Sequence, residues 1–256
     1  MIFSVSHHSG HIKEAEEIRC PYNQLGLIFD FIKENPEKRY NIIINGDTTQ
    51  QETNKLIEQV EYVKEVAKDY TIECGNLMLL KDLLKRGYNT YLRFPVSDWE
   101  TFTDLSNLGV TDIYIDGPLG FDTTALKKRR KDIKIRVSPT ISPNSSITGM
   151  ESNSFFIRPE DLHLYEDIID IIDFHESDID KGDVLFQIYK RGSFIYNIND
   201  LIAGLPRVNN LFIKDDFAKT RLTCKQKCHV PGYRCKFCPS YFYVIENSIK
   251  LAEKSN

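Results

Sequence analysis

Short apolar runs alternate with amphipathic helical segments along most of this chain. The apolar runs are rich in Ile, Val and Tyr, and they predict strands at 2–7, 40–45, 70–74, 89–96, 111–116, 133–140, 154–159 and 168–174. Helical spacing of apolar positions predicts helices at 23–35, 53–69, 76–87, 97–109, 122–132, 160–167 and 193–204. Strand and helix therefore alternate, which is typical of a parallel sheet covered by helices.

Two of the helical segments carry the clearest signals. In 53–69 the apolar residues recur every three or four positions and line one face: Leu56, Ile57, Val60, Val63, Val66 and Ala67. The segment 97–109 opens with Ser97 followed three residues later by Glu100, which is the spacing of a capping box, and it ends at Gly109.

The alternation predicts a (β/α)₈ TIM-like barrel over residues 1–214, because it supplies eight strands and a length of 256 residues suits one such barrel. An open doubly wound sheet uses the same alternation and is the alternative. The strand count favours the barrel. So does the segment HSGHIKEAEE after the first strand, which lacks the G-x-G-x-x-G pattern of a dinucleotide-binding turn. Residues 215–256 are expected to form an appendage packed on the barrel.

Composition narrows the functional classes. The chain has 33 Lys and Arg against 37 Asp and Glu, a net charge of −4, which does not indicate a general attraction to nucleic acid. No apolar run approaches the roughly 20 residues of a membrane span, so no membrane contact is expected. The first residues, MIFSVSHHSG, lack the features of a signal peptide, which favours a cytoplasmic location. Clustered cysteines in that reducing compartment indicate metal ligands rather than disulfides.

Polar residues at the carboxyl ends of the predicted strands are the candidates for a site, because these ends meet at one face of a barrel. The acid–base candidates are Glu73, Asp116 and Glu160. Three arginines could bind an anionic group through their planar guanidinium groups: Arg93, Arg136 and Arg158. The alternative for Arg93 and Arg158 is a structural ion pair with Glu73 or Asp116.

Four of the six cysteines lie in one short segment, CKQKCHVPGYRCKFC, with the spacing C-x₃-C-x₆-C-x₂-C. Two close pairs on either side of a Pro-Gly turn let four thiolates reach one tetrahedral centre. The predicted metal ligands are Cys224, Cys228, Cys235 and Cys238. Zinc is the first interpretation, and a 4Fe-4S cluster is the alternative because it also takes four cysteines.

The same hairpin carries lysines and aromatic residues in alternation, including Lys225, Tyr233, Arg234 and Phe237. Cations beside flat rings suit single-stranded nucleic acid. The alternative is that the aromatic rings pack the hairpin onto the barrel while the lysines face solvent.

Two stretches and the late cysteine cluster resemble the collagenase-like peptidase family. The stretches are SFFIRPEDLHLYEDIIDIIDF (154–174) and YIDGPLGF (114–121). The resemblance implies a TIM-barrel fold, and the family includes enzymes that hydroxylate RNA bases and iron–sulfur proteins of quinone hydroxylation. The family spreads its cysteines through the later part of the barrel, whereas this chain gathers them in one terminal hairpin, so no catalytic residue is carried over.

Two functions therefore stay open from the sequence. The first is a metal-binding barrel enzyme that acts on a nucleobase or another anionic substrate, as in RNA modification. The second is a non-catalytic barrel whose zinc-stapled hairpin serves binding or assembly, with a protein partner or a second copy of the chain. Convergent carboxylates and arginines at the barrel mouth would favour the enzyme.

Overall fold

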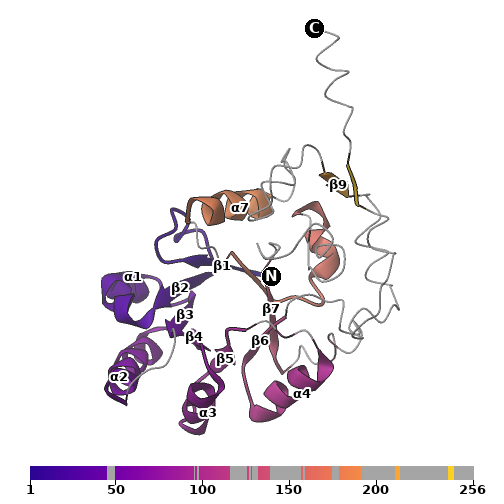
Figure 1. Cartoon of the computed structure of the whole chain (residues 1–256). Helices are drawn as coiled ribbons and strands as arrows, with labels where there is room; N and C mark the ends of the chain where they lie inside the picture. Colours follow the sequence, from indigo (N-terminus) through magenta and orange to yellow (C-terminus); the bar gives the residue numbers. More distant parts are fainter. Residues whose placement is uncertain are drawn as a thin grey trace, which may run out of the picture.

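Eight parallel strands form a nearly closed barrel in the computed structural model of the chain (Figure 1). The strands are β1 (Ile2–Ser6), β2 (Glu17–Pro21), β3 (Arg39–Ile44), β4 (Asp69–Cys74), β5 (Thr90–Leu92), β6 (Asp112–Tyr114), β7 (Lys134–Val137) and β8 (Ile171–Asp173). They are hydrogen-bonded in the order β5-β4-β3-β2-β1-β8-β7-β6. The structure describes residues 1–44, 50–94, 96, 98–115, 126, 128, 132–138, 157, 159–174, 179–191, 211–213 and 242–244.

The ring closes between β5 and β6 through a short seam rather than a regular ladder. The Thr111 amide donates to the Thr90 carbonyl (3.1 Å) at one end of the seam. At the other end the Val96 amide donates to the Tyr114 carbonyl (2.7 Å), and Val96 forms a parallel bridge with Ile115. The predicted barrel is therefore confirmed, and the open sheet is not the fold.

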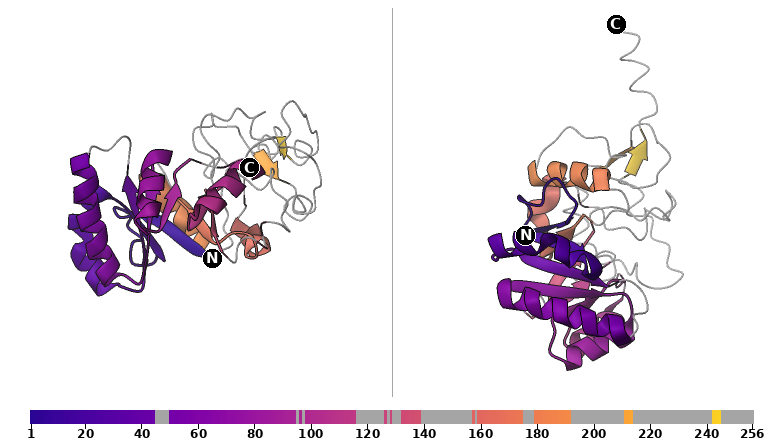
Figure 2. Two further views of the ribbon diagram at one scale, coloured as in Figure 1. Left: turned by 90° about the horizontal axis from the view of Figure 1, so that it is seen from below. Right: turned by 90° about the vertical axis from the view of Figure 1, so that its left-hand side faces the viewer.

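Helices lie outside the ring of strands, as the views in Figures 1 and 2 show. They are the 3₁₀ helix η1 (Tyr22–Ile28), α1 (Phe29–Glu34), α2 (Gln50–Val66), α3 (Leu77–Lys85), α4 (Trp99–Leu108), the 3₁₀ helix η3 (Pro159–Tyr165) and α7 (Ile179–Arg191). Helix α7 follows β8 and packs on β1, where Phe186 contacts Phe3 edge to face (ring centroids 6.1 Å apart). None of the helices within the described ranges is long and apolar enough to cross a bilayer.

The ends of α4 correct one detail of the sequence interpretation. Asp98, rather than the predicted Ser97, is the N-cap, and its carboxylate accepts the amide proton of Thr101 (2.8 Å). Gly109 ends the helix in the left-handed conformation (φ 87°), which glycine adopts without strain. Ser97 lies outside the described residues, so a capping box cannot be assigned.

Residues on each strand alternate between two environments, because successive side chains point to opposite faces. The outward positions are apolar, and they form the core between strands and helices. Seven of them are isoleucines with at most 1% of their surface exposed: Ile18, Ile42, Ile44, Ile72, Ile113, Ile135 and Ile172. Most of the inward positions are polar or charged, with Ile171 of β8 among the exceptions.

The number of predicted strands is right, but one member of the set is wrong. The strand Glu17–Pro21 was not predicted, because EIRCP alternates charged and apolar residues instead of forming an apolar run. The barrel has no strand between β7 and β8, where one was predicted at 154–159, because these two strands pair directly; Pro159 begins η3. Ile157 is buried all the same. Helix α7 was also missed, and the helix expected at 193–204 lies outside the described residues.

A second sheet joins two segments near the carboxyl end of the chain. Strand β10 (Phe242–Val244) pairs antiparallel with β9 (Leu211–Ile213). The expected appendage at 215–256 is therefore hydrogen-bonded to residues that the sequence analysis placed at the end of the barrel. The cysteine hairpin itself lies outside the described residues.

Candidate functional site at the carboxyl end of a charged barrel interior

The barrel interior holds seven ionisable side chains with almost no exposure to solvent. They come from the inward positions of six strands, β2, β3, β4, β6, β7 and β8, and each is at most 5% exposed: Glu17, Arg19, Arg39, Glu73, Asp112, Arg136 and Asp173. The four carboxylates and three guanidinium groups leave one negative charge in excess. Buried charges are stable only when they are paired and hydrogen-bonded, so the contacts among these groups decide whether the barrel can fold.

Arg136 of β7 lies at the middle of this network and is completely buried. Its guanidinium binds Glu17 with both terminal nitrogens, at 2.7 and 2.8 Å. The same nitrogens contact Asp112 (3.1 Å) and Asp173 (3.2 Å). The guanidinium also lies over the ring of Tyr91, 4.7 Å from the centroid. Arg136 was predicted to bind an anionic substrate, but its charge is matched by carboxylates of the chain itself.

The other two buried arginines extend the network toward opposite ends of the barrel. Arg39, near the start of β3, binds both oxygens of Asp112 at 2.8 Å and Glu17 at 2.9 Å. Arg19, further along β2, binds Asp173 at 2.9 Å and Glu73 at 2.5 Å. The carboxyl end of the interior therefore ends in the pair formed by Arg19 and Glu73.

Glu73 connects this buried network to the barrel mouth. Its carboxylate accepts hydrogen bonds from the Tyr91 hydroxyl (2.5 Å) and the Asn41 amide (3.2 Å), in addition to Arg19. Its second oxygen lies 3.5 Å from Nε of Arg93, which directly follows β5. The side chain of Arg93 is 35% exposed, whereas that of Glu73 is 1% exposed. A chain of ion pairs thus connects the buried centre to the guanidinium of Arg93, which is in contact with solvent.

Electrostatics fix the charge states of the two buried glutamates. Burial alone would raise the pKa of Glu17, but the guanidinium groups of Arg136 and Arg39 outweigh it and lower the pKa to about 2. Burial also opposes ionisation of Glu73, and Arg19 with the Tyr91 hydroxyl lowers its pKa to about 2. Both carboxyl groups are therefore ionised at neutral pH. Glu73, predicted as an acid–base residue, has no proton to give in that range.

Two histidines follow β1 at the same end of the barrel. His7 is 9% exposed and its ring lies against that of His8, with centroids 3.7 Å apart. Burial, together with the neighbouring His8, lowers the pKa of His7 below 6.5, so its imidazole is neutral at pH 7.

The structure brings together three of the residues predicted from sequence: Glu73, Arg93 and Arg136. Arg93 pairs with Glu73, which was the alternative considered for it. Glu160 is an exposed residue in the first turn of η3, and it does not follow a barrel strand because the barrel has none between β7 and β8. The remaining predicted residues lie outside the described ranges: Asp116, Arg158, Cys224, Cys228, Cys235 and Cys238.

The candidate residues chosen from the sequence did not include five members of the interior network: Glu17, Arg19, Arg39, Asp112 and Asp173. A signal for them exists, because each occupies an alternate position beside an apolar residue that turns out to be buried on the outer face. No strand was expected at 17–21, and the other missed residues lie at or before the starts of their predicted strands or at a strand end that was not selected. Among the described residues, no three His, Cys, Asp or Glu side chains are grouped closely enough to hold a metal ion.

No family model matches the chain, and no curated protein matches it. Solved structures do. One is a glycerol uptake operon antiterminator-related protein from Thermotoga maritima, with a TM-score of 0.42, 14% identity, and coverage of 74% of this chain and 99% of that one. Another is orotidine 5′-phosphate decarboxylase from Thermotoga maritima, with a TM-score of 0.38, 13% identity, and coverage of 73% and 98%. The fold assignment rests on the strand order itself, and these similarities carry no conclusion about activity.

Proposed function

We propose that this chain is a barrel enzyme that binds an anionic substrate at the carboxyl end of its strands. The observation that carries the proposal is the pair of Glu73 and Arg93. One partner is buried and ionised at neutral pH, and the other is partly exposed at the end where barrel enzymes place their sites. A guanidinium held by a fixed carboxylate loses little side-chain freedom when it binds a phosphate or carboxylate, which favours tight binding.

The residues have distinct roles in this proposal. Arg93 contacts the anion, and Glu73 orients Arg93 without exchanging a proton. His7, which is neutral at pH 7 and follows β1 at the same end, has the charge state of a general base. Asp116 and Arg158 stay as predicted contributors. The resemblance to a family that includes RNA-modifying enzymes favours a nucleotide as the anion.

Metal binding by the terminal hairpin is a second part of the proposal, and it stands on cysteine spacing alone. Zinc would staple the hairpin, whereas a 4Fe-4S cluster would supply redox chemistry. Protein purified without oxygen should contain either zinc in a colourless sample or iron in a brown sample that absorbs near ~400 nm. The variant Cys235→Ser should lose the metal, while Cys74→Ser, which changes a buried free thiol, should retain it. Wild-type protein without metal would contradict this part.

Anion binding at the mouth is tested by titrating the folded chain with nucleoside monophosphates or inorganic phosphate and monitoring the NMR spectrum. We expect Arg93→Gln to weaken binding by about tenfold or more, since hydrogen bonds to charged groups contribute ~1.5–3 kcal/mol. Arg86→Gln is the matched control, because Arg86 is also a partly exposed arginine that pairs with a carboxylate, Asp82 at 3.0 Å. Equal affinities of Arg93→Gln and wild type would reject the proposed anchor.

The second candidate, a binding or assembly module, has one observation of its own. Three apolar side chains that follow β4 and β5 at the carboxyl end are exposed: Leu77 (44%), Met78 (85%) and Phe94 (59%). Exposed apolar groups at one end of a barrel favour a contact surface for another protein or a second copy of the chain. A change in the oligomeric state on Met78→Lys, measured by light scattering, would favour this function, and a monomer in both forms would disfavour it.

A further inference from the structure

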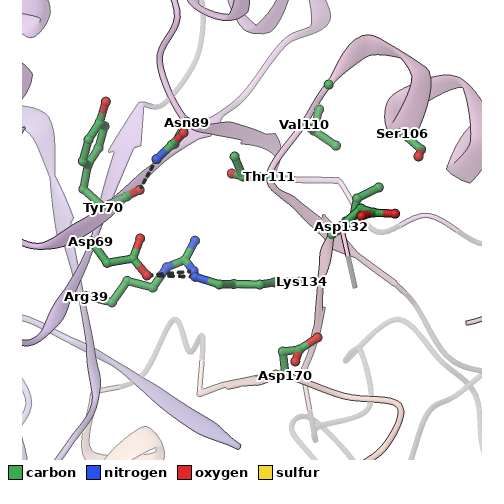
Figure 3. Close-up of a pocket in the computed structure, with 12 residues that line it drawn as sticks. Arg39, Asp69, Tyr70, Asn89, Ser106, Val110, Thr111, Asp132, Lys134 and Asp170 are labelled. Carbon is green, nitrogen blue, oxygen red and sulfur yellow. Dashed lines mark hydrogen bonds and ion pairs between the residues drawn. The ribbon is translucent and has the colours of Figure 1, made fainter. Parts of the chain in front are cut away.

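The described residues form a cavity of about 620 Å³ at the amino-terminal end of the strands, opposite the proposed mouth (Figure 3). At one wall the Lys134 ammonium binds Asp69 at 2.8 Å, and Arg39 approaches the same oxygen at 3.5 Å. Asp170 accepts the amide proton of Ile135 at 2.9 Å. Because these charged groups are matched within the chain, the cavity does not indicate what it would bind. The carboxyl end of β1 is more informative.

The connection between β1 and β2 is held by a helix that lies far away in the sequence. Residues 7–16 form this connection without a helix of their own, and α7, which follows β8, packs on β1 instead. The residues of α7 that contact the connection are spaced by three or four positions, so they share one face of the helix. They are Asp183, Phe186, Gln187 and Lys190.

Asp183 holds the first part of this connection with both of its carboxylate oxygens. Oδ1 accepts the hydroxyl proton of Ser9, and Oδ2 accepts the amide proton of Gly10 at 2.9 Å. The hydroxyl oxygen of Ser9 also accepts the amide proton of His11 at 3.0 Å. A Cβ atom at position 10 would lie 3.2 Å from Oδ2 of Asp183, so glycine permits this close approach. Ser9 is therefore fixed by α7 and is only 6% exposed.

His7 lies in the turn that ends at Ser9. The amide of Ser9 donates to the carbonyl of Ser6 at 3.0 Å, which places His7 at the first central position of a four-residue turn. The amide of His7 donates to the carbonyl of Arg19 at 2.8 Å, which attaches the turn to β2. The turn is thus held by β2 at one end and by Asp183 of α7 at the other.

We propose that Asp183 is a positioning residue for His7, because its grip on Ser9 and Gly10 fixes the turn that keeps the His7 ring in place at the barrel mouth. The role rests on the proposed function, in which His7 has the charge state of a general base. Asp183 acts through the turn, and it neither contacts the substrate nor exchanges a proton with it.

The pKa of His7 reports whether the turn is in place. Burial lowers this pKa most and His8 lowers it further, whereas hydrogen bonds with the Arg19 backbone and the Gln24 side chain raise it. Releasing the turn would admit water to the ring, so the pKa should rise toward its ordinary value of 6.5. Loss of a carboxylate charge that acts directly on the ring would instead lower the pKa. The sign therefore separates positioning from a direct electrostatic effect.

The test is an NMR pH titration of the His7 ring in the full chain, with urea denaturation of each variant in parallel. Asp183→Ala removes both acceptors, and the pKa of His7 should rise toward 6.5. Asp183→Asn keeps one acceptor oxygen, so its pKa should lie between those of wild type and Asp183→Ala. Lys190→Met is the matched control, because it removes another contact of α7 with the same connection, to Glu16 at 2.6 Å, outside the turn.

Ser9→Ala releases the turn from the other side, since it removes the hydroxyl that Asp183 binds and leaves α7 unchanged. It should also raise the pKa of His7, and it keeps the test decisive if Asp183→Ala does not fold. An unchanged or lowered pKa of His7 in the folded variants would overturn the proposal, even where the urea midpoint falls. An equal rise in Lys190→Met would overturn it as well.

Titration of Arg93→Gln with a nucleoside monophosphate separates this role from the proposed function. Binding that does not depend on Arg93 would reject the anion anchor and leave the result at His7 as it stands. A His7 ring that does not respond to Asp183→Ala and Ser9→Ala, beside a clear effect of Arg93→Gln, would reject the positioning role alone.

Discussion

The substitution Arg136→Met tests whether the buried ion network holds the barrel together. Methionine has a similar length and removes the positive charge that lies against Glu17, Asp112 and Asp173. Glu17 would lose its two shortest bonds to a guanidinium while remaining 0% exposed. Removing one member of a buried ion pair costs ~3–5 kcal/mol of folding free energy, because the partner charge is left without compensation.

A limit on that cost follows from the chemistry of the carboxyl group. The variant can protonate Glu17 in the folded state, and at pH 7 this costs about 3 kcal/mol for a group with an ordinary pKa near 4.5. The expected loss is therefore about 3 kcal/mol at pH 7. Since protonation becomes easier in mild acid, the difference between variant and wild type should shrink by about 1.4 kcal/mol per pH unit toward pH 5.

The assay is urea denaturation followed by circular dichroism at pH 7 and at pH 5.5, for wild type, Arg136→Met and the double variant Arg136→Met with Glu17→Gln. The double variant should be more stable than Arg136→Met at pH 7, because it removes a buried negative charge that Arg39 alone then has to match. Arg86→Met is the control, since its exposed pair with Asp82 contributes less than ~1 kcal/mol. A loss for Arg136→Met no larger than that of Arg86→Met would refute the role given to the network.

Two further predictions concern pH and helix capping. Glu17 and Glu73 have folded-state pKa values of about 2, so each contributes about 3 kcal/mol to the free energy of unfolding above pH 5, and this is lost as the pH falls toward 2. Acid titration followed by circular dichroism should show unfolding in this window. A chain that stays folded at pH 2 would contradict the prediction. Asp98→Ala should cost ~1 kcal/mol by removing the cap of α4, whereas Asp98→Asn should retain most of the stability; equal urea midpoints for both would contradict the capping role.

The alternation of strands and helices was predictable because it depends on one-dimensional patterns. Runs such as YNIIIN, at 40–45, indicate that the outer face of a strand is buried against helices. The helical spacing of apolar residues indicates the helix face that packs on those strands. The strand at 17–21 was not predictable from apolar runs, since its inner face carries Glu17 and Arg19. Conversely, Ile157 from the apolar run at 154–159 is buried without belonging to a barrel strand, because burial does not require strand pairing.

The candidate site was predictable only in part, for a related reason. Glu73 and Arg93 could be proposed because they lie at the carboxyl ends of predicted strands. Whether a charged residue in such a strand meets a substrate or another residue of the chain depends on what faces it across the barrel. Arg136 shows this: the pattern singles it out, and only the three-dimensional contacts with Glu17 and Asp112 reveal that its charge is already matched.

The seam between β5 and β6 gives the ring a weakest point. Elsewhere the strands share ladders, which range from six residue pairs between β3 and β4 to two between β7 and β8. Among the described residues this junction is held by backbone bonds at Thr111 and Val96 and by one bridge. Local opening should therefore separate β5 from β6 before any other pair of strands. Water could then reach Tyr91 and Arg136 while the strands on the opposite side stay paired. The buried ion network of the barrel can thus be hydrated by transient opening between β5 and β6.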